Sequence, residues 1–370
     1  MTFAVRLLPI DAVIDHPNAD RLSIYTVRGY NCISAKSESG DHRFKVGERV
    51  IFVPENALLT EAQLKEQGFW AYNMELGREA GTLFGKGYNR VDTIQLRKRE
   101  STGLIWKQPD EFVDLPDNTD VAERLGITKY EPEIPAELLQ VVTPVDAVRQ
   151  TFDIARLRMY PNFFLGEEVA ITEKLEGENV QLTWMGDQRA EGVHSDGQIA
   201  ISTKGLAEKR LAFLDTPGAA SIPVLQAINA SGLIDKLADL AHSVGTHRTI
   251  KIIAEAIGPG IKKLHYGYCA PFARAFDIRI DGVWLGEDEK AMSFKKHNIE
   301  RAPLLCRGPF NPETVEELRQ GNTTIAGGHI REGIVIAAVG SQVKRETELG
   351  DEIRPVLKAH SDVFLRKFSH

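Results

Sequence analysis

The chain has 370 residues, 42% of them hydrophobic and 26% charged, with a net charge of −7. This length exceeds what one hydrophobic core usually supports, so we expect at least two domains in a soluble globular protein. The longest uncharged stretch, 216–234, contains two prolines and two glycines, which excludes a membrane span there. The N-terminus lacks the pattern of a secretory signal.

Charge and cysteine content narrow the class of protein further. An acidic chain argues against nucleic-acid binding unless basic residues gather locally, as they do at 97–99, 204–210 and 262–263. The alternative is that each of these runs is only a solvent-exposed face with no binding role. Three widely separated cysteines give neither a disulfide framework nor a zinc-ligand spacing. We therefore expect a cytoplasmic protein.

Residues 1–125 show short alternating segments separated by turn residues, which predicts a small β-barrel. The expected strands include 3–8, 22–27, 49–53 and 91–96. The run His-Pro-Asn-Ala-Asp-Arg-Leu at 16–22 resembles the opening of the tRNA-binding OB domains of some aminoacyl-tRNA synthetases. That resemblance implies a nucleic-acid-binding face. The alternative is that this run is only a turn that starts a strand.

Residues 126–150 combine prolines and acidic residues without a hydrophobic period, which predicts a linker. A larger second domain is expected at 151–370, with helices at 223–242 and 312–320. The expected strands are 168–173, 179–184, 249–254, 272–280, 334–338 and 353–358, with a hairpin turn at Asp281-Gly282. Together these elements predict an α+β fold, in which an OB-like barrel precedes an antiparallel-sheet domain with flanking helices.

A lysine ends one of these strands, in the run Lys174-Leu175-Glu176-Gly177-Glu178-Asn179. A lysine attacks phosphorus only as the neutral amine, so we expect partial burial and nearby positive charge, such as a metal ion, to lower the pKa of Lys174. Gly177 would let the backbone turn closely round a nucleotide, and Asn179 offers an amide to a sugar hydroxyl or a phosphate. Alone, this spacing is typical of a surface turn.

Four further segments follow in order along the chain. They are Ala254-Glu255-Ala256-Ile257-Gly258-Pro259-Gly260, Phe276-Asp277, Arg331-Glu332-Gly333-Ile334-Val335-Ile336 and Val356-Leu357-Lys358-Ala359-His360. With the lysine run, this ordered series resembles the covalent nucleotidyltransferase superfamily of polynucleotide ligases and mRNA capping enzymes.

The resemblance implies a nucleotide site. Lys174 would form a phosphoramidate with a nucleoside monophosphate, and Glu173 would contact the purine and its sugar. Glu255 would hold a ribose hydroxyl or a metal-bound water, or else only cap the Gly-Pro-Gly turn. Phe276 would stack on adenine, and Asp277 would fix nearby basic side chains or metal-bound waters.

The last two segments complete that site. Glu332 would bind the catalytic metal, Mg²⁺ or Mn²⁺, and Lys358 would contact the α-phosphate. Two positions depart from the family pattern. Lys204 stands where the family has an arginine, and it either supplies a point charge or only precedes a helix. His360 replaces a second lysine, so that cation would depend on pH.

An OB-like module at the front, together with the Gly-Pro-Gly match, resembles the ATP-dependent RNA ligases with an N-terminal OB domain. DNA ligases and capping enzymes carry an OB domain after the final motif, whereas only 359–370 follow Lys358. The resemblance implies sealing of 3′-OH/5′-phosphate breaks, in duplexes with an RNA 3′-OH end, through a lysyl-AMP intermediate. ATP would be the substrate, and RNA or a nicked RNA-containing duplex the partner, with no membrane or obligate protein partner evident. A GTP-using guanylyltransferase and a non-catalytic RNA-binding protein remain alternatives.

Overall fold

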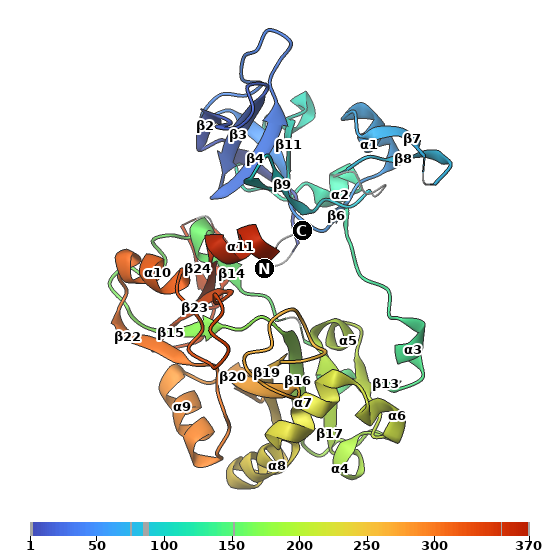
Figure 1. Cartoon of the computed structure of the whole chain (residues 1–370), viewed down its shortest axis with the longest axis vertical. Coiled ribbons are helices and arrows are strands. Elements are labelled where there is room, and N and C mark those ends of the chain that lie inside the picture. The colour runs from blue at the N-terminus through green and yellow to red at the C-terminus, as the bar shows by residue number, and fades with distance from the viewer. Residues whose placement is uncertain (1–2, 75, 84–88, 151, 349, 369–370) are drawn as a thin grey trace.

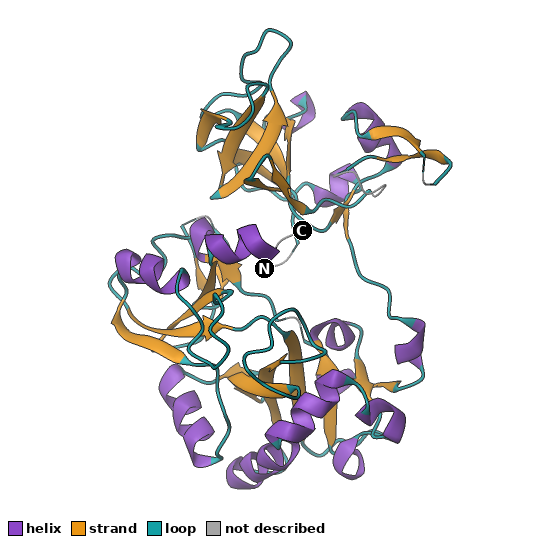
Figure 2. Cartoon of the chain, viewed as in Figure 1, coloured by secondary structure: helices purple, strands orange, loops and turns teal. Residues whose placement is uncertain are grey.

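The computed structural model describes the chain except for residues 1–2, 75, 84–88, 151, 349 and 369–370. Figure 1 shows an N-terminal part and a larger second part, joined by a long segment between β12 (Thr128–Lys129) and α3 (Ala136–Leu139). Helices gather mainly around the second part, as Figure 2 shows. None of the helices in the described ranges is both long and apolar enough to cross a bilayer.

Short sheets build the N-terminal part. One sheet pairs β1 (Arg6–Pro9), β5 (Arg49–Val53) and β11 (Leu104–Lys107), a second pairs β2 (Ala12–Asp15), β3 (Leu22–Val27) and β4 (Tyr30–Ala35), and β9 (Thr93–Leu96) pairs with β10 (Arg99–Thr102). Beside them lie β6 (Ala57–Leu58), α1 (Glu61–Glu66), β7 (Trp70–Asn73), β8 (Arg78–Gly81), η1 (Asp110–Phe112), α2 (Ala122–Leu125) and β12 (Thr128–Lys129).

The ladders among the described residues do not close these sheets into a barrel. Between β4 and β10 the contact is made partly by side chains. Ile33 donates its backbone N–H to Oγ of Ser101 over 2.9 Å, and Sγ of Cys32 donates to the carbonyl of Thr102 over 3.3 Å. The closed OB-like barrel therefore stays a prediction, although β3 and β5 have the predicted bounds.

Two five-stranded sheets form the second part. The first sheet has the order β14 (Ala155–Arg156), β26 (Val356–His360), β23 (Gly333–Ala338), β15 (Glu168–Lys174) and β22 (Leu304–Pro309). The second has the order β17 (Ile199–Thr203), β16 (Glu178–Met185), β19 (Thr249–Ile257), β20 (Phe272–Ile280) and β21 (Val283–Trp284). Neighbouring strands are antiparallel except β14 and β26, which are parallel. The α+β class is confirmed.

Alternation of side chains gives each sheet a core face and a second face. On β15, Val169 and Ile171 are buried in a hydrophobic core, whereas Ala170, Thr172 and Lys174 line a cavity between the sheets. On β19, residues 250, 252, 254 and 256 pack against α7 (Pro223–Ser231) and α8 (Leu233–Val244). The alternate positions of β19 include two charged residues, Lys251 and Glu255.

One of the two predicted helices is interrupted, and the other is confirmed. The helix expected at 223–242 is two helices, because Gly232 adopts a left-handed conformation with φ +64° and ends α7. The expected helix at 312–320 is confirmed as α10 (Pro312–Arg319). α9 (Glu287–Lys296) was not predicted, because its sequence is polar almost throughout.

The predicted linker contains short elements of its own, α3 (Ala136–Leu139), β13 (Val142–Pro144) and η2 (Asp146–Val148), and β13 pairs with β18 (Leu211–Phe213). The remaining elements are η3 (Leu157–Met159), α4 (His194–Gly197), α5 (Lys204–Glu208), α6 (Pro217–Ala220), β24 (Arg345–Glu346), β25 (Glu352–Ile353) and α11 (Asp362–Phe368).

Candidate active site

A cavity between the two large sheets brings most of the predicted site residues together. The predicted residues that line it are Glu173, Lys174, Asn179, Lys204, Glu255, Phe276, Asp277 and Lys358. They come from β15, β16, α5, β19, β20 and β26, so segments far apart in the chain meet here. Gly177 and Glu332 lie just outside the lining. Each of them contacts a residue that lines the cavity: Gly177 packs against Glu255, and Glu332 pairs with Lys174.

Lys174 is the last residue of β15 and forms an ion pair with Glu332. Its Nζ lies 2.7 Å from Oε1 of Glu332. Burial alone lowers the pKa of Lys174, but the charges of Glu332 and Glu255 outweigh burial and raise it. The expected lowering, which included positive charge such as a metal ion, is absent in the protein alone and stays a prediction for the metal-bound site. Positive charge that engages the two carboxylates would reverse the balance.

Gly177 lies in the turn between β15 and β16, against β19. A Cβ atom there would lie 2.1 Å from the carbonyl oxygen of Ala256 and 2.8 Å from Cγ of Glu255. This close approach is an observed reason for glycine, in addition to the predicted one. It allows β16 to pair with β19 so that Asn179 lies opposite Glu255.

Glu173 is buried with one carboxylate oxygen in use. Its Oε2 accepts hydrogen bonds from the backbone N–H of Thr324 at 2.9 Å and from the Thr324 hydroxyl at 3.0 Å. Oε1 is buried and has no partner in the described part of the chain. A buried acceptor of this kind is suited to a donor on a ligand.

Aromatic rings and buried charges form the wall around Phe276. The ring of Phe276 lies 5.3 Å from that of Phe152, centroid to centroid. Asp277 accepts a hydrogen bond of 2.6 Å from Arg354 and lies 3.8 Å from Nζ of Lys290. As predicted, Asp277 contacts basic side chains.

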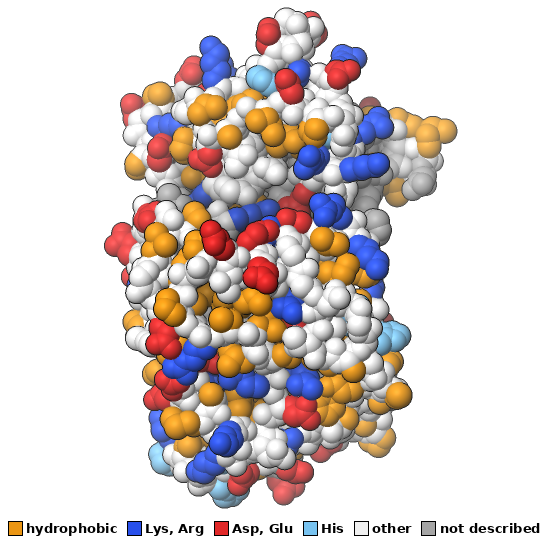
Figure 3. Space-filling model, turned by 60° about the vertical axis from the view of Figure 1, so that its left-hand side comes forward, with side chains coloured by type: hydrophobic (Ala, Val, Ile, Leu, Met, Phe, Trp, Pro, Cys, Tyr) orange, Lys and Arg blue, Asp and Glu red, His pale blue; other side chains and the backbone are white. Residues whose placement is uncertain are grey.

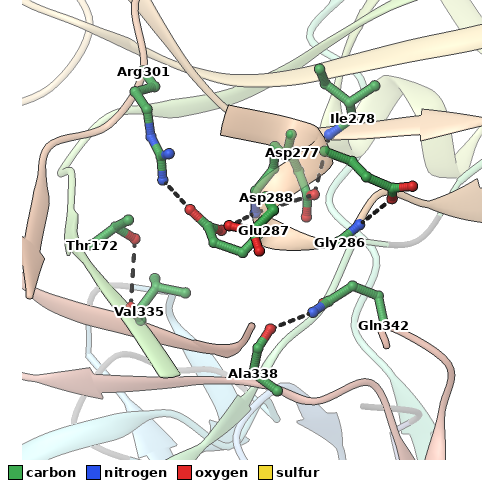
Figure 4. Close-up of polar contacts among 12 residues, drawn as sticks. Thr172, Asp277, Ile278, Gly286, Glu287, Asp288, Arg301, Val335, Ala338 and Gln342 are labelled. Carbon is green, nitrogen blue, oxygen red and sulfur yellow. Dashed lines mark hydrogen bonds and ion pairs between the residues drawn. The ribbon is translucent and has the colours of Figure 1, made fainter. Parts of the chain in front are cut away.

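A second buried carboxylate continues this charged wall. Glu287, on α9, lies 2.6 Å from a guanidinium nitrogen of Arg301 and 2.9 Å from Nζ of Lys290. Figure 4 shows Arg301 and Glu287 pointing toward one another beside Asp277. The paired cations lower the pKa of Glu287 against the opposing effect of burial. The carboxylates of this wall therefore stay ionised, and the paired Lys and Arg side chains neutralise them.

Positive charge gathers at the other end of the cavity. Nζ of Lys204 donates to Asp153 over 2.6 Å, so Lys204 belongs to the cavity and does not merely precede a helix. Burial, Lys174 and Arg156 lower the pKa of Lys358 to about 8. Burial and the same neighbours hold the pKa of His360 well below its usual range. A second, pH-dependent cation at His360 therefore stays a prediction.

Comparison with known proteins identifies the family. A model of the family described as RNA ligase matches residues 167–360, which is more than half of the chain. The chain belongs to the RNA ligase family. This confirms the resemblance to RNA ligases of the nucleotidyltransferase superfamily, whereas the branch with an N-terminal OB domain stays a prediction. The predicted site segments all lie within the match or at its edge. No curated protein sequence matches the chain.

Solved structures of an RNA ligase from Naegleria gruberi share the fold of this ligase. An apo mutant superposes with a TM-score of 0.69 at 20% identity, covering 99% of this chain and 98% of the other. A mutant with ATP and Mn gives 0.68 at 19% identity, with 99% of each chain covered. The complex with PPi gives 0.66 at 21% identity, covering 99% and 98%. At these identities the likeness concerns the fold.

Sequence reasoning missed several residues that line the cavity of this ligase. They are Phe152, Asp153, Glu287, Lys290 and Arg301. A signal existed for the first two, because Phe152-Asp153 repeats the Phe-Asp pair at 276–277. For the α9 residues the sequence offered only a polar helix, with no sign that two of its charged side chains are buried.

The residues present fit a divalent cation of the magnesium type. Oε2 of Glu332 is buried without a partner in the described ranges, and Glu255 faces the same lysine. No group of three or more His, Cys, Asp or Glu side chains within the described residues could hold a metal by itself. Mg²⁺ commonly takes only one or two carboxylates and completes its shell with phosphates and water. The ligase therefore fits a metal that arrives with a nucleotide.

Proposed function

We propose that this ligase joins RNA ends with ATP in three steps, with Lys174 as the nucleophile. The observation that carries the proposal is the position of Lys174 Nζ, which lies 2.7 Å from Glu332 at a cavity that Phe276 and Lys358 also line. The Naegleria gruberi ligase, similar in fold, has been solved with ATP and Mn and with AMP and Mn. These complexes support ATP as the substrate here, with Mg²⁺ or Mn²⁺ as the metal.

In the first step, the lone pair of Lys174 Nζ attacks the α-phosphorus of ATP. A P–N bond forms, the bond from the α-phosphorus to the bridging oxygen breaks, and pyrophosphate leaves. The amine proton passes to solvent. Lys358 stabilises charge on the α-phosphate. A cation held by Glu255 and Glu332 would neutralise phosphate charge and free Lys174 from its ion pair.

In the second step, an oxygen of the RNA 5′-phosphate attacks the phosphorus of lysyl-AMP. The P–N bond breaks and Lys174 takes up a proton. In the third step, the 3′-hydroxyl of the other RNA end attacks the 5′-phosphate phosphorus, so that a phosphodiester forms and AMP leaves. The protein contributes mainly positioning and charge, as in other phosphoryl transfers.

The other cavity residues bind the nucleotide. Phe276 stacks on adenine, and the free Oε1 of Glu173 accepts from the base or the sugar. Asn179 and Glu255, opposite each other on β16 and β19, meet the ribose. Lys204 supplies a point charge to a phosphate. Asp277 does not bind the nucleotide itself, because it is paired with Arg354 and Lys290.

The proposed substrate is a nick in a duplex with an RNA 3′-OH end. Its support is the OB-like pattern of residues 1–125 together with the Gly-Pro-Gly segment after Glu255. In this proposal 1–125 is an RNA-binding domain, 126–150 a linker and 151–370 the adenylyltransferase domain.

Incubation with α-labelled ATP or GTP and Mg²⁺, followed by denaturing electrophoresis, tests the first step. ATP should label the wild type and Lys295→Ala, which alters an exposed lysine on α9, but not Lys174→Ala. Labelled enzyme should then seal a nicked duplex with an RNA 3′-OH end faster than a DNA nick or single strands. Label from GTP would indicate a guanylyltransferase, and RNA binding without any label a non-catalytic protein.

A further inference from the structure

Arg156 lies beside Lys358, although the two residues are far apart in the chain. β14 runs parallel to β26, and Arg156 and Lys358 are register partners. Both side chains line the groove between the N-terminal part and the second part, and both line a cavity beneath α10 and α11. Lys358 also lines the nucleotide cavity. The pair therefore stands where three cavities meet.

The order of strands in the first sheet places the three cationic residues in a row. Across the first sheet, Lys174 lies on β15, Lys358 two strands away on β26, and Arg156 on β14 at the edge. Adjacent strands are about 4.8 Å apart. A phosphate held between Lys174 and Lys358 would therefore carry its next phosphate toward Arg156.

A second arginine, Arg158, adds unused hydrogen-bond donors to the cavity beneath α10 and α11. Arg158 donates from Nη1 to Glu100 at 3.0 Å, whereas its Nε and Nη2 are buried and without a partner in the described part of the chain. Arg156 pairs with Glu55 at 3.0 Å. For Lys358, no carboxylate of the described residues lies within ion-pair distance. Buried donors without partners, such as those of Arg158, are costly unless an anion satisfies them.

His360 stands where the family has a second lysine, and it lines the cavity beneath α10 and α11 together with Arg156, Arg158 and Lys358. Arg156 and Arg158 therefore place positive charge beside this position, from β14 and η3 rather than from β26.

On the basis of the proposed function, we propose that Arg156 and Arg158, together with Lys358, bind the phosphate that neighbours the α-phosphate on the side away from Lys174. In the first step this group is the β-phosphate of ATP, and in the second it is the 5′-phosphate of the RNA. Both must take one position, because the group that leaves and the group that attacks each lie in line with Lys174 Nζ across the α-phosphorus.

The N-terminal part holds these arginines in place. Glu55 and Glu100 pair with them, and the ring of Tyr30 lies 5.5 Å from the guanidinium carbon of Arg156 and 4.4 Å from that of Arg158. Figure 3 shows Lys and Arg side chains gathered with acidic ones along the band where the two parts meet. The N-terminal part thus positions the phosphate site as well as any RNA that it binds.

The test separates the two steps in single-turnover experiments. Adduct formation is measured against ATP concentration, and transfer of AMP from preformed lysyl-AMP is measured against the concentration of 5′-phosphorylated RNA. Arg158→Ala should raise the concentration for half-maximal rate in both by about tenfold or more, the loss expected for one charge-assisted hydrogen bond. Arg158→Lys should recover part of it.

Arg345→Ala is a matched control. Arg345 pairs with Glu167 at 2.6 Å and lies 4.3 Å from the Phe163 ring, with its side chain 38% exposed against 32% for Arg158. It should leave both steps unchanged. Equal losses in both variants would indicate a structural role and overturn the proposal, as would unchanged kinetics in Arg158→Ala.

The two phosphate sources give different signatures. A loss in the ATP step alone, or in the RNA step alone, would overturn the shared site. If the wild type forms no adduct, the proposed function fails and the phosphate site falls with it. If the wild type forms the adduct and Arg158→Ala matches it in both steps, only the phosphate site fails.

Discussion

Nζ of Lys174 lies 2.7 Å from Oε1 of Glu332, so the nucleophile and the proposed metal ligand neutralise each other in the protein alone. Lys174→Arg keeps this ion pair but cannot provide a neutral nitrogen, because arginine stays protonated. We expect no labelled adduct from ATP, with the free energy of unfolding within about 1 kcal/mol of the wild type. Labelling and thermal unfolding measure the two effects. Label on Lys174→Arg would place the nucleophile elsewhere.

Glu255 should make stability fall as pH rises. Burial raises its pKa to about 8, against an opposing effect of Lys174. Between the ordinary carboxylate pKa and pH 8, the folded protein binds a proton that the unfolded chain has lost, so the free energy of unfolding decreases with pH there. Glu255→Gln should therefore unfold at a higher temperature than the wild type at pH 8.5 and at a similar temperature at pH 5, without metal or nucleotide. An equal difference at both pH values would contradict the shift.

Gly177 and Gly205 should respond in opposite ways to alanine. At Gly177 the new Cβ meets Ala256 and Glu255, so we expect a loss of about 1–3 kcal/mol in stability and slower adduct formation. Gly205 lies in α5 with nothing within 4 Å of the position that a Cβ would take, and alanine there should stabilise the helix by at most about 1 kcal/mol. Chemical denaturation and ATP labelling compare the two variants. Equal tolerance at both positions would mean that β16 can shift away from β19.

The sequence was most informative where chemistry and strand alternation agree. Lys174, Glu255 and Phe276 were each expected at or within a strand, and β15, β19 and β20 bring them to one cavity. The order of these three residues along the chain could be recognised without knowledge of the tertiary structure. The break at Gly232 was not predicted, because the hydrophobic period continues from α7 into α8.

What could not be predicted depends on contacts between distant segments. Arg156 gains its place only because β14 lies beside β26, and Arg158 because Glu100 holds it from the N-terminal part. Glu287 and Lys290 are a polar pair in sequence, yet both are buried, since they compensate one another and Arg301. Periodicity assigns such residues to a solvated face.

Lys251 gives a prediction about stability away from the proposed chemistry. It is buried on β19, and burial together with Arg279 lowers its pKa to about 8. Between pH 8 and the ordinary pKa of lysine, the unfolded chain binds a proton that the folded protein does not, so the free energy of unfolding rises with pH in that window. Below pH 8 both states are protonated and the cost of burying the charge is complete, about 3 kcal/mol.

Lys251→Met should therefore raise the free energy of unfolding at pH 7 by up to about 3 kcal/mol, and the gain should shrink as pH rises above 8. Urea denaturation at pH 7 and pH 9.5 measures both values. Lys295→Met, on the exposed face of α9, is the control and should change neither. A destabilised Lys251→Met at pH 7 would show instead that the hydrogen bond from Nζ to the carbonyl of Arg149, 3.4 Å long, outweighs the cost of the buried charge.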